Sequence, residues 1–149
     1  MKVDIQVDSK YEETKVVIYT SEITDEIQEV INSLKKAGKK HILGTKGEKI
    51  YILNPQEISF FYSERGKVFA QTDNLYYEVK EKLYELEERL KGTSFVRISK
   101  SSIANVNKIK NLEMFFNGSM CVNFISGKQE YISRRYMKNV KEYFNMGGR

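Results

Sequence analysis

The chain has 149 residues, of which 40% are hydrophobic and 30% are charged, and its formal net charge is +5. This length accommodates one domain, or one domain with a small appendage. The ten tyrosines and the single proline argue against disorder, because aromatic side chains supply burial that disordered segments lack. No apolar run is long enough to span a bilayer and the N-terminus has no signal-peptide core, so we expect a cytoplasmic protein.

The positive charge is concentrated in the last third of the chain. Residues 1–45 contain 7 Lys and Arg against 8 Asp and Glu, whereas residues 92–149 contain 10 against 3, a net charge of +7. A local field of this kind suits a polyanion such as DNA, RNA or an anionic membrane surface. The alternative is a solvated basic surface without a partner, and charge alone does not separate the two.

The first 43 residues predict a small α/β segment. Residues 2–8 alternate polar and apolar side chains, and residues 14–19 are rich in β-branched residues, so both stretches are expected to form strands. Thr24 is a suitable N-cap for a helix. The apolar face of that helix consists of Ile27, Val30, Ile31 and Leu34. Because so short a unit is near the lower limit for independent folding, we expect it to pack on its neighbour or on a second copy.

Residues 44–149 predict an antiparallel, mainly β domain, which makes the chain α+β as a whole. Residues 39–48 are rich in Lys and Gly and are interpreted as a connector that runs into a strand. Further strands are expected at 49–53, 58–62, 68–72, 76–79, 95–98, 109–116, 120–125 and 129–132. Helices are expected at 80–91, with Gly92 as the stop signal, and from Tyr136 onward.

The sequence argues against an enzyme and against a resident cofactor or metal ion. His41 is the only histidine, and Cys121 is the only cysteine, which excludes an intramolecular disulfide and a cysteine-based metal cage. Cys121 lies in a predicted hairpin strand, where a thiol usually fills core space. The chain has no glycine-rich phosphate loop and no nucleophile elbow.

Three basic segments, each at the end of a predicted strand, are the candidate nucleic-acid contacts. They are the hairpin turn with Arg65 and Lys67, the cluster Ser99, Lys100 and Ser101, and the strand–helix junction Ser133, Arg134 and Arg135. Loops presented together by a rigid sheet form a plausible surface for a major groove.

Each segment also has a purely structural interpretation. Ser99 and Ser101, at the start of an expected helical turn, suit phosphate oxygens but equally suit capping of that turn. Arginine matches guanine edges in a bidentate manner, yet Arg134 and Arg135 could be ordinary surface residues. A basic hairpin tip is often present for solubility alone.

Residues 95–109, FVRISKSSIANVNKI, closely resemble the hallmark segment of LytTR DNA-binding domains, in which a strand is followed by a basic-Ser turn and Ile/Val-x-Asn. Residues 126–138, with Ile-Ser-Arg-Arg-Tyr-Met-Lys, resemble the closing pattern of that family. Residues 53–61 resemble its opening strand. The resemblance covers about residues 44–146, and several motifs occur in the family's order.

The resemblance implies an elongated antiparallel β fold of stacked small sheets with short helices. It also implies a transcriptional regulator that inserts loop residues into successive major grooves of double-stranded DNA. The contact positions implied are the 65–67 turn, Lys100 and Arg135. The pair Ser99-Lys100 departs from the histidine followed by arginine or asparagine that is commonest in the family.

The resemblance further implies how such a regulator is organised. Many members of the family carry a receiver domain, for which the first 45 residues are too few, so the chain resembles a stand-alone, response-regulator-like branch. A homodimer and a regulatory membrane-protein partner are then expected. The alternative is an RNA-binding or protein-interaction adaptor module, because Tyr62, Phe69, Tyr76 and Tyr131 could stack on single-stranded bases.

Overall fold

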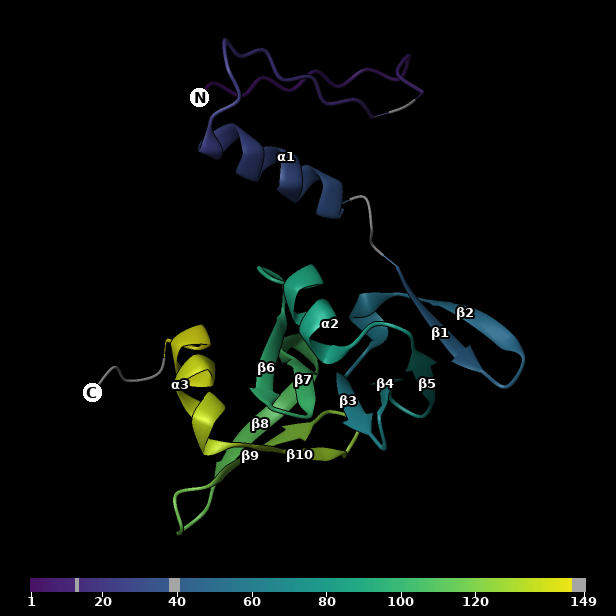
Figure 1. The fold of residues 1–149 in the computed structure, drawn as a ribbon, viewed down its shortest axis with the longest axis vertical. Coiled ribbons are helices and arrows are strands. Elements are labelled where there is room, and N and C mark those ends of the chain that lie inside the picture. Colours follow the sequence, from purple (N-terminus) through teal and green to yellow (C-terminus); the bar gives the residue numbers. More distant parts are fainter. Residues whose placement is uncertain (13, 38–40, 146–149) are drawn as a thin grey trace. The chain divides into compact units, whose positions relative to one another are not determined.

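The computed structural model describes residues 1–12, 14–37 and 41–145 (Figure 1). The chain divides into two compact units, Met1–Lys35 and Lys36–Arg149. The domain boundary expected between residues 43 and 44 stays a prediction.

The N-terminal unit contains one of its three expected elements. Helix α1, Asp25–Ala37, is confirmed, and the Thr24 hydroxyl accepts a hydrogen bond from the Ile27 amide at 3.3 Å. The strands expected at 2–8 and 14–19 are wrong, since none of the described residues before α1 is in a strand. An isolated two-stranded ribbon is only marginally stable in water, and the apolar side chains here are exposed rather than buried on a third strand.

The described part of the second unit contains ten strands in two antiparallel sheets. The seven-stranded sheet has the order β2-β1-β5-β4-β3-β7-β6, and the three-stranded sheet has the order β10-β9-β8. The strands are β1 Ile42–Lys46, β2 Lys49–Leu53, β3 Phe60–Glu64, β4 Lys67–Gln71, β5 Tyr76–Val79, β6 Phe95–Ser99, β7 Ser102–Asn105, β8 Ile109–Met114, β9 Met120–Phe124 and β10 Gln129–Ile132. This is the mainly β, antiparallel fold with short helices that the sequence predicts.

The large sheet has a hydrophobic core on each of its faces. On one face, α2 (Leu83–Arg89) places Leu86 against a cluster that includes Phe61 and Ala70, and all three residues are fully buried. On the other face, Phe60 packs against Phe124 of the small sheet with their ring centroids 4.8 Å apart. Helix α3 (Arg134–Tyr143) adds Val140 to this second core. Neighbouring residues along β3 therefore point into different cores, as the two-residue period of a strand requires.

Two strands differ from the sequence-based expectation. Residues 42–46, taken as part of a connector, form β1, while residues 39 and 40 of that connector lie outside the described residues. Residues 102–105, taken as the start of a helical turn, form β7, in which all four residues are buried. β7 does not alternate in polarity because both of its faces are covered, whereas in β1 the exposed side is occupied by the apolar Leu43.

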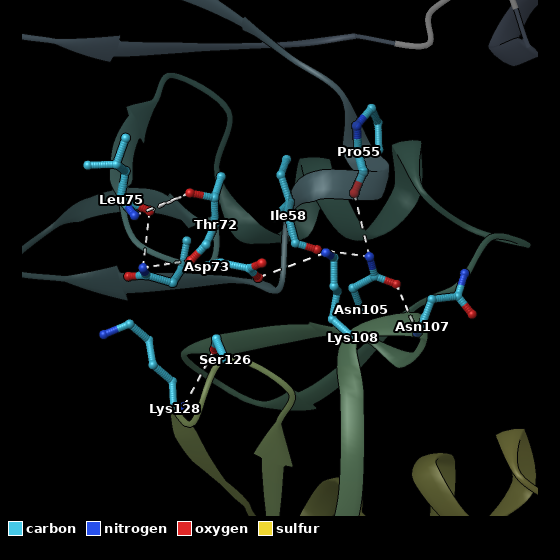
Figure 2. Close-up of polar contacts among 11 residues, drawn as sticks. Pro55, Ile58, Thr72, Asp73, Leu75, Asn105, Asn107, Lys108, Ser126 and Lys128 are labelled. Carbon is cyan, nitrogen blue, oxygen red and sulfur yellow. Dashed lines mark hydrogen bonds and ion pairs between the residues drawn. The ribbon is translucent and has the colours of Figure 1, made fainter.

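A buried amide, that of Asn105, connects β7 to two other parts of the chain (Figure 2). The Asn105 Nδ2 donates to the Ile58 carbonyl at 2.8 Å, and its Oδ1 accepts from the Asn107 amide at 3.1 Å and the Ser94 hydroxyl at 2.8 Å. The side chain thus satisfies polar groups next to two 3-10 turns, Pro55–Glu57 and Val106–Lys108. Asn105 is only 1% exposed, so these groups have little access to water. This gives a structural reason for the Asn of the Ile-x-Asn motif.

We predict that Asn105→Ala lowers the free energy of unfolding by about 2–3 kcal/mol, because it leaves the Ile58 carbonyl and the Ser94 hydroxyl without their buried partner. Asn105→Asp keeps the acceptor but lacks the amide donor, so it tests the donor side. Urea titration monitored by circular dichroism provides the measurement. Unchanged stability in both variants would contradict a structural role for this amide.

Candidate nucleic-acid interface

The three basic segments singled out in the sequence meet at one end of the large sheet. Tyr62 pairs with Ser102 in the β3–β7 ladder, and the Ser63 amide donates to the Ser101 carbonyl at 2.9 Å. The β3–β4 turn and the β6–β7 turn are therefore neighbours. The Ser133 amide donates to the Ile98 carbonyl at 3.0 Å, which places the start of α3 beside the end of β6. In Figure 1 the lower ends of β3, β6 and α3 lie at the same end of the unit, and we call residues 65–67, 99–101 and 133–135 the basic end.

The β3–β4 turn presents its basic residues on a two-residue loop. Arg65 has φ 51° and Gly66 has φ 77°, and the flanking residues Glu64 and Lys67 are paired. This is the type I′ geometry that matches the twist of a hairpin. Arg65 is exposed, and Lys67 makes only an exposed 3.6 Å ion pair with Glu78, an interaction that contributes little. Arginine rarely adopts positive φ, and here the backbone favours glycine or asparagine instead.

The β6–β7 turn presents Lys100 to solvent. The Ser99 hydroxyl accepts a hydrogen bond from the Ser101 amide at 3.2 Å, and the two hydroxyls lie 3.3 Å apart. The segment is a hairpin turn and not the start of a helical turn, and its serines stabilise the turn itself. The helical turn that these serines were expected to cap is wrong, and their hydrogen bonds lie within the hairpin turn.

Sequence reasoning missed Arg97, which holds the β6–β7 turn in place. Its Nε donates to the Ser99 carbonyl at 2.7 Å and its Nη2 donates to the Lys100 carbonyl at 2.6 Å. Its Nη1 lies 2.9 Å from the Glu87 carboxylate on α2, and its guanidinium lies 5.8 Å from the Tyr136 ring centroid on α3. The one available signal was a charged residue in the middle of an otherwise apolar strand, since such a residue needs partners.

The β10–α3 junction exposes both arginines but not the serine. Arg134 donates from Nη2 to the Asn117 carbonyl at 3.3 Å. Arg135 is exposed and has neither a hydrogen bond nor an ion pair with another described residue. The Ser133 hydroxyl is buried and lacks a hydrogen-bond partner within the described part of the chain, so it is not presented at the surface. Arg135 is therefore the cation of this segment that is available to a ligand.

Several carboxylates lie beside the basic end: Glu64 precedes Arg65, Glu78 pairs with Lys67, and Glu130 lies next to β7. Glu130 of β10 accepts a hydrogen bond from the Ser102 hydroxyl at 3.2 Å. Burial raises the pKa of Glu130, and the Ser102 hydrogen bond opposes that shift. Burial also raises the pKa of Tyr62, with further contributions from the nearby Glu64 and Glu130 carboxylates. The Glu130 carboxylate is partly withdrawn from solvent, whereas the Glu64 carboxylate next to Arg65 is exposed.

Other kinds of site are not apparent among residues 1–12, 14–37 and 41–145. No group of three or more His, Cys, Asp or Glu side chains there is arranged to hold a metal ion. None of the helices in these ranges combines the length and the apolar character of a membrane span.

Comparison with known proteins identifies the family. Residues 48–145 match the model of the LytTr DNA-binding domain. The chain belongs to the LytTR DNA-binding domain family. It is 34% identical over 143 residues to an uncharacterized HTH-type transcriptional regulator of Staphylococcus aureus strain MSSA476, and equally to one of strain MW2. Each alignment covers 95% of this chain and 97% of the relative.

A solved structure confirms the fold of this LytTR domain. It is the LytTr DNA-binding domain of a putative methyl-accepting/DNA response regulator from Bacillus cereus, with a TM-score of 0.69 at 20% identity. The match covers 72% of this chain and 98% of that one. Although the S. aureus relatives are named HTH-type, the three α-helices described here are separated from one another by strands, so they form no helix-turn-helix.

We predict that Arg65→Asn raises stability and lowers affinity for DNA. Asparagine tolerates positive φ better than arginine does, so the unfolding free energy should rise by roughly 1 kcal/mol, whereas the loss of the exposed cation should weaken binding. Thermal unfolding and fluorescence anisotropy on duplex DNA give the two readouts. If stability rises while affinity is unchanged, the turn serves the fold alone.

Proposed function

We propose that this LytTR protein is a sequence-specific transcriptional regulator that inserts the loops of its basic end into successive major grooves of double-stranded DNA. The observation that supports the proposal is the convergence of three loops, far apart in the sequence, at one end of a rigid sheet. Exposed lysine and arginine supply both the phosphate attraction and the base-edge donors that such binding needs.

The contacts that each proposed site residue makes within the chain suggest a different role for each of them in DNA binding. Arg135 is exposed and has no partner among the described residues, and we assign it to a guanine edge. Lys100 projects from a turn whose backbone is held by hydrogen bonds from Arg97. We assign Lys100 to a phosphate or a base edge farther along the same groove. Arg65 and Lys67 then supply phosphate contacts at the third loop, while Ser99 and Ser101 shape the turn.

The rival function, single-stranded RNA binding, is less well supported. Tyr62 and Phe69 are half-buried and stack on each other with ring centroids 5.3 Å apart. Tyr76 is 53% exposed but meets Phe69 edge-on at 5.8 Å. These three rings pack against one another, and the fourth, Tyr131, is 62% exposed but lies on the small sheet, whereas base stacking needs open ring faces on one surface.

We also propose that the protein is a homodimer formed through its N-terminal unit. In the described part of the chain, no residue before Ile42 is buried. The apolar face of α1 is only half-buried at Ile27, Val30 and Ile31, and Leu34 is 41% exposed. A unit without its own core requires a cover, and a second copy supplies an identical face.

A cytoplasmic location and the absence of catalysis are consistent with this role and stay predictions. The regulatory membrane-protein partner also stays a prediction. Such a partner would control DNA binding by sequestering the regulator, and not by phosphorylating it. A pull-down that recovers no membrane protein, together with phosphorylation-dependent DNA binding, would contradict it.

We predict that Arg135→Ala lowers affinity for the preferred duplex by about 1–3 kcal/mol and leaves affinity for random duplex nearly unchanged, because a base-edge contact acts only on the correct sequence. The preferred duplex is first selected from random sequences with the full chain. Binding is then measured by anisotropy at several salt concentrations, with single-stranded competitor as a further arm.

Lys91→Ala is the control, since Lys91 is an exposed cation that follows α2 and lies outside the basic end. Equal losses on specific and random duplex would make Arg135 a phosphate contact. Preferential competition by single strands would favour the RNA-binding alternative.

We predict that Ile31→Glu converts a dimer into a monomer at micromolar concentration, because a buried, unpaired carboxylate on the α1 face costs several kcal/mol. Asn32→Glu adds the same charge at an exposed neighbouring position and should leave the dimer intact. Light scattering measures the mass. If the wild-type chain has the mass of one copy at this concentration, the stable dimer is contradicted.

A further inference from the structure

The tip of the β8–β9 hairpin, Phe115–Ser119, is a rigid loop that the proposed site does not include. The Phe115 amide donates to the Ser119 carbonyl at 2.9 Å, and the Gly118 amide donates to the Phe115 carbonyl at 3.0 Å. The Asn117 Oδ1 accepts from both the amide and the hydroxyl of Ser119, at 3.0 and 2.6 Å. Gly118 has φ 82°, so the loop has the three-residue form with a left-handed glycine. These hydrogen bonds define the backbone of the turn that carries Phe116.

This rigid tip exposes large apolar side chains to solvent. Phe116 is fully exposed, at 114% of its reference area, and Met114 is 66% exposed. Phe115 is 37% exposed and packs against Tyr131, with ring centroids 6.4 Å apart. A cluster of this kind on a well-ordered turn marks an interaction surface, because leaving it in water forgoes the free energy of burying a phenyl ring.

The position of the tip indicates what that surface meets. The Asn117 carbonyl accepts the 3.3 Å hydrogen bond from Arg134, so the tip is directly attached to the basic end. Figure 1 shows the β8–β9 hairpin extending past the first turn of α3 at the end of the unit where β3 and β6 also finish. No residue from 114 to 119 is acidic, so nothing in the tip repels phosphates.

We propose that the β8–β9 tip is a fourth DNA-contacting loop, in which Phe116 packs against thymine 5-methyl groups beside the groove that Arg135 enters. Thymine methyls are the apolar groups on the floor of the major groove, and phenylalanine is one of the side chains that contact them. The inference rests on the proposed duplex binding and adds an apolar specificity element to an otherwise cationic site. Arg134 belongs to the basic end and hydrogen-bonds to the tip, which links the positions of the two.

The test is a double-mutant cycle between the protein and its DNA. The full chain first selects a preferred duplex, in which each thymine is then replaced by deoxyuridine one position at a time, so that only the methyl group is lost. Affinities of wild type, Phe116→Ala and the exposed-aromatic control Tyr84→Ala are measured on each duplex. Tyr84 is 65% exposed on α2, against the opposite face of the sheet.

At one or two positions, we expect replacement of thymine by deoxyuridine to lower the affinity of the wild type for the duplex by roughly three- to tenfold. On the duplex that contains thymine, Phe116→Ala should lower the affinity by a similar factor. Loss of the methyl group should then have no further effect on Phe116→Ala, while Tyr84→Ala behaves like the wild type. Because Phe116 is in solvent, thermal unfolding of Phe116→Ala should match the wild type, which shows that the loss is local.

Three results would overturn the inference. Equal methyl effects in wild type and Phe116→Ala at every position would show that the tip does not contact thymine. Unchanged affinity of Phe116→Ala, with a change in the mass of the free protein, would make the tip a protein-protein contact. A wild type that selects no duplex overturns the proposed function itself, whereas selection without any Phe116 effect overturns this inference alone.

Discussion

The register of β7 depends on one buried side-chain amide. This strand has four residues, all buried, and lies between β3 and β6, whose turns belong to the basic end. At its far end the Asn105 amide bonds to the Ile58 carbonyl and the Ser94 hydroxyl, so β7 is fixed to the chain segments that lead into β3 and β6. A slip of one residue would exchange the two faces of the strand and move Lys100 away from its neighbours.

At the other end of β7, a second polar contact fixes the turn rather than the strand. The Arg97 guanidinium binds two consecutive carbonyls of the β6–β7 turn and the Glu87 carboxylate of α2. Its side chain is only 11% exposed, so these hydrogen bonds also offset the cost of withdrawing a charge from water. The consequence is that Lys100 projects from a rigid turn, and less conformational entropy is lost when it meets a ligand.

Two sheets are needed to collect the loops at one end. The large sheet brings the β3–β4 and β6–β7 turns together through the antiparallel pairing of β3 with β7. The small sheet returns the chain from the β8–β9 tip to the start of α3, where Arg134 joins the tip to the basic end. A cationic surface and an apolar projection are thus presented by one framework. Long-range attraction by the cations and short-range discrimination by an apolar contact are complementary contributions to recognition.

The sequence by itself determined most strands, the α1, α2 and α3 helices and the chemistry of the basic loops. These features depend on neighbours within a few residues, such as the two-residue period of strands and the positive φ of Gly66, Gly118 and Gly127. Local patterns did not reveal that β1 and β7 are strands, that the N-terminal stretches are not, that the Ser133 hydroxyl is buried or that Arg97 holds a turn. Each of these outcomes depends on partners far away in the chain, and local composition carries no record of which distant residue will supply the hydrogen bond or the cover.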